Sequence, residues 1–210
     1  MKLEDKIKNE LMKTVGQRKY NGWNNRTSFG YHSYNIDDVN IVGQRNPKMR
    51  LDSFREHIDF TDKVVVDFGC NVGAMLHHLT EIKQGIGLDY DSNCINAANE
   101  IAELLGRDNL SYYTHDFDKN SYDELRNIIL ETPDIIFALS LGSWVKTWEQ
   151  LYSLALEYDA KIILEINNEE EGKPQLDLFK TKGIKPKLIL DNSLDDSTGN
   201  NRRRTYLIEK

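Results

Sequence analysis

The chain has 210 residues and a formal net charge of −7, and 39% of its residues are hydrophobic. This length suits one α/β domain with a modest extension, because domains usually span about 100–200 residues. The longest apolar runs, such as residues 135–139, are much shorter than the ~20 residues that span a bilayer. No apolar segment follows the charged start, so we expect a cytoplasmic protein without a membrane anchor.

Charge and cysteine content narrow the expected partners. Cys70 and Cys94 lack the spacing of a metal site and are too few for a disulfide framework, so we expect reduced thiols and no bound metal. The negative charge disfavours a large nucleic-acid footprint, because phosphate contacts need clustered Lys and Arg. A small-molecule partner is therefore favoured over RNA, which stays an alternative.

Residues 1–60 differ in character from the rest of the chain. We expect an amphipathic helix near the start, an Asn-, Gly- and aromatic-rich stretch over 20–34, and a helix over 47–57. This extension is expected either to wrap the surface or to close over an active site as a lid. The catalytic domain is expected to occupy residues 61–210.

From about residue 63, short apolar runs alternate with amphipathic stretches, which is typical of βαβ units around a mostly parallel sheet. The predicted strands are 63–68, 85–89, 110–115, 134–139, 161–166, 185–190 and 203–208. The predicted helices lie between 68 and 85, then near 92–105, 122–130, 148–158 and 174–182. The last two strands flank a polar stretch with Gly199-Asn200, so they should form an antiparallel hairpin.

The first predicted strand leads into the sequence Asp67-Phe68-Gly69-Cys70-Asn71-Val72-Gly73. Gly69 and Gly73 lack a Cβ, so a ligand can approach the main chain closely there. The pattern is DxGxxxG rather than the GxGxxG of dinucleotide-binding loops. Asp67 would repel a pyrophosphate but accommodate an ammonium group, which indicates an aminoacyl ligand rather than NAD.

Two further acidic residues follow neighbouring strands. Asp89 ends the second strand, where a carboxylate can accept both hydroxyls of a ribose. The alternative role for Asp89, capping the next helix, is better filled by Asp91 and Ser92. Asp116 and Phe117 follow the third strand, where they could accept an adenine amino group and form an aromatic wall. The alternative for Asp116 is simple turn formation.

Together these elements resemble the class I S-adenosylmethionine-dependent methyltransferases over about residues 60–210. The resemblance implies a Rossmann-like three-layer α/β sandwich whose seven-stranded sheet has the order 3-2-1-4-5-7-6, with strand 7 antiparallel. It also implies methyl transfer from S-adenosyl-L-methionine, with S-adenosyl-L-homocysteine as the product. The implied cofactor residues are Asp67, Gly69, Cys70, Asn71, Gly73, Asp89, Tyr90, Asp116, Phe117, Ser140 and Leu141.

A finer similarity is to the methylphosphate-capping and bicoid-interacting group. It rests on Gly69-Cys70-Asn71 and on the Leu-Ser-x-x-x-Trp stretch that ends at Trp144. The chain departs from that group beyond Trp144, and its acidic balance does not favour RNA. RNA methylation, on a 5′-phosphate or a tRNA, is therefore an alternative to a small polar or nucleotide-like acceptor. A non-catalytic, cofactor-binding regulatory protein is an alternative of another class.

Three segments, 30–50, 140–148 and 165–168, are expected to face the acceptor at the carboxyl edge of the sheet. The candidate substrate residues are Tyr31, Arg45, Trp144, Asn167 and Asn168. Arg45 and Arg50 are expected to pair with a carboxylate of the cofactor or acceptor, or else to lie exposed on a helix. His32 and Glu165 are candidate bases for a hydroxyl acceptor, although a nitrogen acceptor needs none. Turn formation and capping are the alternatives for 165–168.

Overall fold

The computed structural model describes residues 1–20, 29–193, 195–196 and 203–210. Its main sheet contains β3 (Val64–Phe68), β4 (Gln84–Asp89), β5 (Leu110–Thr114), β6 (Ile135–Leu139), β7 (Lys161–Glu165), β8 (Lys187–Leu190) and β9 (Thr205–Ile208). The spatial order is β5-β4-β3-β6-β7-β9-β8, and β9 runs antiparallel to both of its neighbours. Counted from β3, this is the order 3-2-1-4-5-7-6 that the resemblance implies.

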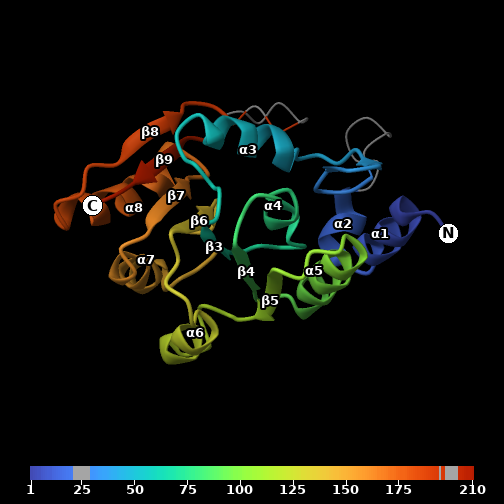
Figure 1. Ribbon diagram of the computed structural model, residues 1–210. Coiled ribbons are helices and arrows are strands. Elements are labelled where there is room, and N and C mark those ends of the chain that lie inside the picture. Colours follow the sequence, from blue (N-terminus) through green and yellow to red (C-terminus); the bar gives the residue numbers. More distant parts are fainter. Residues whose placement is uncertain (21–28, 194, 197–202) are drawn as a thin grey trace.

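Helices cover both faces of this sheet (Figure 1). One face packs against α6 (Tyr122–Ile128), α7 (Trp148–Glu157) and α8 (Glu169–Thr181). The other packs against α3 (Pro47–Arg55), α4 (Ala74–His77) and α5 (Ser92–Leu104). Side chains alternate along a strand, so Val66 of β3 faces the first group of helices and Val65 the second. The same alternation directs Asp67 to the side of α3, α4 and α5.

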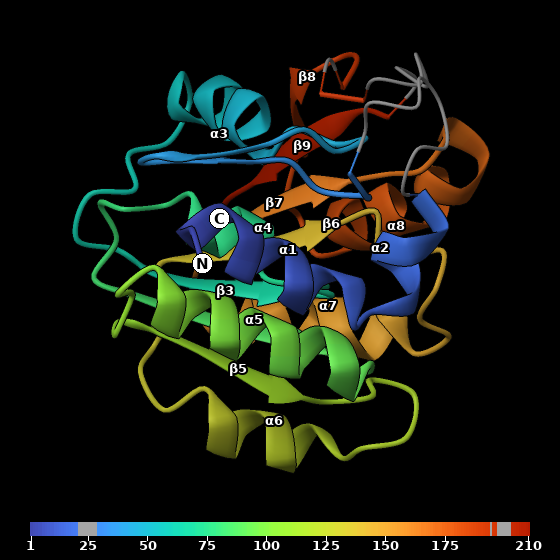
Figure 2. The same cartoon turned by 90° about the vertical axis from the view of Figure 1, so that its right-hand side faces the viewer.

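The N-terminal segment adds a further layer outside α4 and α5. It contains α1 (Leu3–Met12), α2 (Val15–Tyr20) and a hairpin of β1 (Tyr34–Ile36) and β2 (Val39–Ile41). Figure 2 shows α1 lying against α5, and Ile7 and Leu11 of α1 share a buried cluster with Ile101 of α5. The hairpin was not predicted from the sequence, because each of its strands has only three residues.

A tyrosine joins this layer to the loop that follows β3. The hydroxyl of Tyr34 donates to the carbonyl oxygen of Val72 at 3.0 Å and lies 3.3 Å from Nδ1 of His77. The amide of Asn35 donates to Nε2 of His78 at 3.2 Å. Burial lowers the pKa of His77 to about 3 and that of His78 to about 4, so both rings are neutral near pH 7.

The predicted strands match the observed ones within two residues at each end, and the predicted terminal hairpin is present. Two helices differ. The helix after β3 is a single turn, and α8 begins at Glu169 because the side chain of Asn168 accepts a hydrogen bond from the amide of Glu171. The connection at Gly199-Asn200 lies outside the described residues. No helix in the described part of the chain is both long and apolar enough to cross a membrane.

Tyr34→Phe tests the link between the N-terminal layer and the β3 loop. The substitution leaves the carbonyl of Val72 without its buried donor, so we expect the free energy of unfolding to fall by about 1–2 kcal/mol. Tyr113→Phe is the matched control, because that ring is 42% exposed. Urea unfolding measures both, and equal stabilities of the two variants would contradict the link.

Candidate functional site

A cavity of about 320 Å³ lies at the carboxyl ends of β3, β4, β5 and β6. All of the predicted cofactor residues except Gly73 border it. The predicted substrate residues Tyr31, Trp144 and Asn167 and the candidate base His32 border it as well, together with Arg50 and Arg203. Most of the residues predicted to bind the cofactor or the substrate therefore lie on the wall of one cavity.

Left-handed backbone shapes the loop after β3, where φ is 76° at Gly69, 52° at Asn71 and 73° at Gly73. The carboxylate of Asp89 accepts hydrogen bonds from the amide of Asn71 at 2.9 Å and from that of Asp91 at 3.0 Å. This ties the loop to the end of β4. Asp91 caps α5, as expected, by accepting from the amide of Asn93 at 2.9 Å.

Gly73 has a different role from the one that its motif suggested. A Cβ at this position would lie 2.5 Å from the ring of Tyr112. Gly73 therefore lets α4 begin directly against that ring, and it does not border the cavity.

Asp67 is buried, and its carboxylate has no hydrogen-bond partner among the described residues although it borders the cavity. Burial raises the pKa of Asp67 to about 8, an effect that Arg50 opposes and Asp89 reinforces. The side chain therefore holds a proton at neutral pH in the absence of a ligand. A bound cation would stabilise the ionised form.

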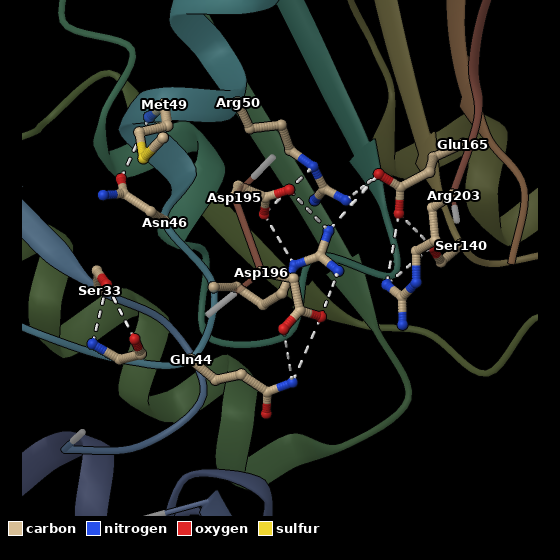
Figure 3. A network of polar contacts seen from close by, with 12 residues as sticks. Ser33, Gln44, Asn46, Met49, Arg50, Ser140, Glu165, Asp195, Asp196 and Arg203 are labelled. Carbon is tan, nitrogen blue, oxygen red and sulfur yellow. Dashed lines mark hydrogen bonds and ion pairs between the residues drawn. The ribbon is translucent and has the colours of Figure 1, made fainter. Parts of the chain in front are cut away.

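Glu165 sits at the centre of a buried network of charged groups (Figure 3). One of its carboxylate oxygens accepts from Arg50 and lies 3.6 Å from Nη2 of Arg45. The other accepts from the hydroxyl of Ser140 and lies 3.4 Å from Nη1 of Arg203. Burial alone would raise the pKa of Glu165, but the arginines and Ser140 outweigh it and hold the pKa at about 2. Glu165 is therefore not available as a base, contrary to the sequence-based hypothesis.

Arg45 is also placed differently from either expectation. It is 1% exposed and lies outside the cavity lining. Its Nε and Nη2 donate to the carboxylate of Asp195 at 2.8 and 3.2 Å, and its Nη1 donates to Asp196 at 3.2 Å. Arg45 is therefore neither exposed nor a wall residue of the cavity, because its guanidinium forms buried ion pairs with Asp195 and Asp196.

The two asparagines after β7, Asn167 and Asn168, differ in their surroundings. Asn167 borders the cavity, and its Nδ2 donates to the carbonyl oxygen of Ser140 at 3.5 Å. Asn168 caps α8 and does not border the cavity, which agrees with the capping alternative rather than with substrate contact.

Aromatic and imidazole rings complete the wall. His32 is 7% exposed, and its Nδ1 has no hydrogen-bond partner among the described residues. Burial, together with the charges of Arg50 and Arg45, lowers the pKa of His32 well below its usual value, so the ring is neutral. Trp144 and Tyr90 are 79% and 72% exposed, which places their rings at the rim.

Sequence reasoning missed Asp118 and Arg203, which both border the cavity. The run Arg202-Arg203-Arg204 before the last strand was the available signal for the second of them. The described residues contain no group of three or more His, Cys, Asp or Glu side chains that could hold a metal ion.

The sequence matches neither a protein-family model nor a curated protein. Solved structures do match. A precorrin-6y C5,15-methyltransferase from Geobacter metallireducens superimposes with a TM-score of 0.60 at 11% identity, over 78% of this chain and 87% of that one. A SAM-dependent methyltransferase from Aquifex aeolicus gives 0.56 at 14% identity, over 79% and 89%. An rRNA methylase from Streptococcus thermophilus gives 0.56 at 16%, over 77% and 94%.

The fold is that of the S-adenosylmethionine-dependent methyltransferases. This confirms, at the level of the fold, the resemblance that Asp67, Gly69, Gly73 and Asp89 indicated. A further structure of this fold, SMU.776, is a putative methyltransferase complexed with SAH, with a TM-score of 0.55 at 16% identity.

Glu165→Gln tests the charged network. The amide keeps the shape but removes the charge that three arginines share, so we expect the free energy of unfolding to fall by about 3–5 kcal/mol. Glu157→Gln is the control, because its pair with Arg126 is exposed and is worth less than about 1 kcal/mol. Chemical unfolding compares the variants, and similar small losses for both would show that Glu165 does not hold the network.

The raised pKa of Asp67 predicts a pH dependence of stability. Between pH 3.8 and about 8 the folded chain keeps a proton that the unfolded chain has lost. Stability should therefore fall as the pH rises through this window, by up to about 1.4 kcal/mol per pH unit. Asp67→Asn should remove this component, whereas the exposed control Asp108→Asn should keep it. Unfolding curves measured from pH 4 to pH 8 that run parallel for wild type and Asp67→Asn would contradict the assignment.

Proposed function

We propose that this chain binds S-adenosyl-L-methionine and transfers its methyl group to a small polar molecule. The observation that carries the proposal is the acidic cavity wall at the ends of β3, β4 and β5, formed by Asp67, Asp89, Asp116 and Asp118. This wall lies in a fold shared with S-adenosylmethionine-dependent methyltransferases. S-Adenosylmethionine carries an ammonium and a sulfonium, so an acidic wall complements it.

The residues present fit this cofactor. Asp67 offers a buried carboxylate without a hydrogen-bond partner among the described residues, which suits the ammonium group. Asp89 is held in place by the amides of Asn71 and Asp91 and would accept the ribose hydroxyls. Phe117, buried beside the cavity, would contact the adenine, and the exposed ring of Tyr90 would cover it.

When bound, S-adenosylmethionine supplies a methyl group on a sulfonium that leaves as a neutral thioether. The protein's task is then to hold the acceptor in line with that methyl group and to exclude water. Ser140 and Leu141 border the cavity after β6, between the cofactor residues and Asn167, and would form the floor of the transfer site. His32 is neutral and has an unpaired Nδ1, so it would accept a hydrogen bond from a hydroxyl acceptor and orient it; burial and the arginine charges, which lower its pKa, make it a weak base.

The cavity would have to hold both the cofactor and the reacting group of the acceptor, which leaves room for only a small acceptor group. A volume of about 320 Å³ lies at the low end of the ~300–1,000 Å³ of ligand pockets. Tyr31 and His32 from the N-terminal extension border it, so that extension forms part of the wall over the acceptor. We infer that residues 1–60 act as a cover for the catalytic domain formed by 61–210.

Calorimetry with S-adenosylmethionine and S-adenosylhomocysteine tests the cofactor. Asp89→Asn should weaken both by about tenfold or more, because an amide cannot accept from the loop amides and both ribose hydroxyls at once. Asp108→Asn, an exposed aspartate outside the cavity, should leave both affinities unchanged. No binding by the wild type at tens of micromolar, or equal affinities in the two variants, would contradict the cofactor assignment.

Release of S-adenosylhomocysteine against pooled metabolites and against RNA then tests turnover. Activity on metabolites is the expected result. Activity on RNA that falls steeply with salt would overturn the small-molecule acceptor. Tight cofactor binding without turnover on either pool would instead favour a regulatory protein.

A further inference from the structure

The wall of the cavity is divided by charge. The aspartates of the wall lie where β3, β4 and β5 end, whereas its arginines, Arg50 and Arg203, lie on the side of β7 and β9. If the chain is the methyltransferase proposed above, the acidic side faces the cofactor, whose carboxylate would meet Arg50, and Arg203 is the arginine that faces the acceptor. We propose that the acceptor carries a carboxylate or phosphate group and that Arg203 binds it.

Arg203 is held in a position that suits an anion. Its side chain is 19% exposed and borders the cavity. Nη1 donates to the hydroxyl of Ser140 at 3.2 Å and to Glu165 at 3.4 Å. Within the described residues, Nε and Nη2 have no hydrogen-bond partner, and Figure 3 shows that the dashed lines of Arg203 all leave one terminal nitrogen. Because Nη1 is held in place while Nε and Nη2 are free, this guanidinium can bind carboxylate or phosphate oxygens with two parallel hydrogen bonds.

The charge of Arg203 is only partly compensated. Its recorded ion-pair partner in the described chain is Glu165, and that single carboxylate also pairs with Arg45 and Arg50. Arg45 has Asp195 and Asp196 in addition, but Arg203 contacts neither of them. An incoming anion would therefore meet a guanidinium with residual positive charge in a partly buried site, where electrostatic attraction is stronger than in water.

Two further polar side chains, Asn167 and His32, border the same cavity. Asn167 borders the cavity with an Nδ2 that is engaged only at 3.5 Å. His32 presents a buried Nδ1 that lacks a partner among the described residues. This nitrogen is therefore free to form a hydrogen bond with a polar group of a ligand.

Arg50 serves the other half of the cavity. Arg50 borders the cavity with a buried Nε that has no hydrogen-bond partner among the described residues, and its charge opposes the rise in the pKa of Asp67. Arg50 is therefore placed to meet the carboxylate of the cofactor. Arg203 is left for the acceptor.

Calorimetric titration of the wild-type chain, saturated with S-adenosylhomocysteine, tests the proposal. The probes are inorganic phosphate and acetate, each at constant ionic strength in chloride. We expect millimolar binding of at least one of them, weakened about tenfold or more by Arg203→Gln. Arg204→Gln is the matched control, because Arg204 is half-buried, lies outside the cavity lining and pairs with Asp191 at 2.7 Å. It should bind both anions as the wild type does.

The outcomes separate the proposal from the proposed function. Stronger binding of acetate indicates a carboxylated acceptor, and stronger binding of phosphate a phosphorylated one. Arg203→Lys, which keeps the charge but not the planar fork, should retain part of the affinity. Absence of anion binding in the wild type, or equal binding in Arg203→Gln, overturns the proposal.

Affinity for S-adenosylhomocysteine provides a second readout, and it should stay within about twofold of wild type in Arg203→Gln. A large loss would place Arg203 in the cofactor half and overturn the proposal. Tighter binding of a 5′-phosphorylated RNA than of phosphate would overturn a small acceptor. If the wild type fails to bind S-adenosylhomocysteine, the proposed function fails by itself.

Discussion

The carboxylate of Glu165 at the end of β7 gathers three arginines that approach from different parts of the chain. Arg45 precedes α3, Arg50 lies within α3, and Arg203 precedes β9. A buried charge without a partner costs several kcal/mol, so each of these guanidinium groups must lie beside a carboxylate when its segment is buried. Their positions over the sheet are therefore set relative to β7. The side of the cavity that holds Arg50 and Arg203 therefore depends on that one carboxylate.

The same carboxylate fixes the turn after β6. Ser140 has a φ of 58°, which is unfavourable for a residue with a side chain. Its amide donates to the carbonyl oxygen of Glu165 at 2.9 Å, and its hydroxyl donates to the Glu165 carboxylate. Leu141, the next residue, packs so closely on Gly69 that a Cβ there would lie 2.8 Å from Leu141 Cδ1. The turn after β6 is thus in direct contact with the loop after β3.

The sequence predicted the parts of the site that depend on local signals. Asp67 and Asp89 end apolar strands, and the ends of neighbouring parallel strands meet at one edge, so their convergence could be inferred. Arg45 and Glu165 were misinterpreted because their partners lie far away in the chain, with 150 residues between Arg45 and Asp195 and 115 between Arg50 and Glu165. For Gly73, the sequence predicted the unusual backbone conformation but not the group that lies against it. Only the folded chain shows that this group is the ring of Tyr112.

The pairing of Arg45 with Asp195 and Asp196 also constrains the order of events during synthesis. Chains emerge from the ribosome at about 5–20 residues per second, and early segments can fold before later ones appear. β3, β4 and β5, with the cofactor loop between them, can pair while the chain is still growing. Arg45 cannot be buried until Asp195 and Asp196 have emerged, because those carboxylates replace the water around its guanidinium. The side of the cavity that holds Arg50 and Arg203 is therefore completed only after residues 195, 196 and 203 have emerged, later than the loop that follows β3.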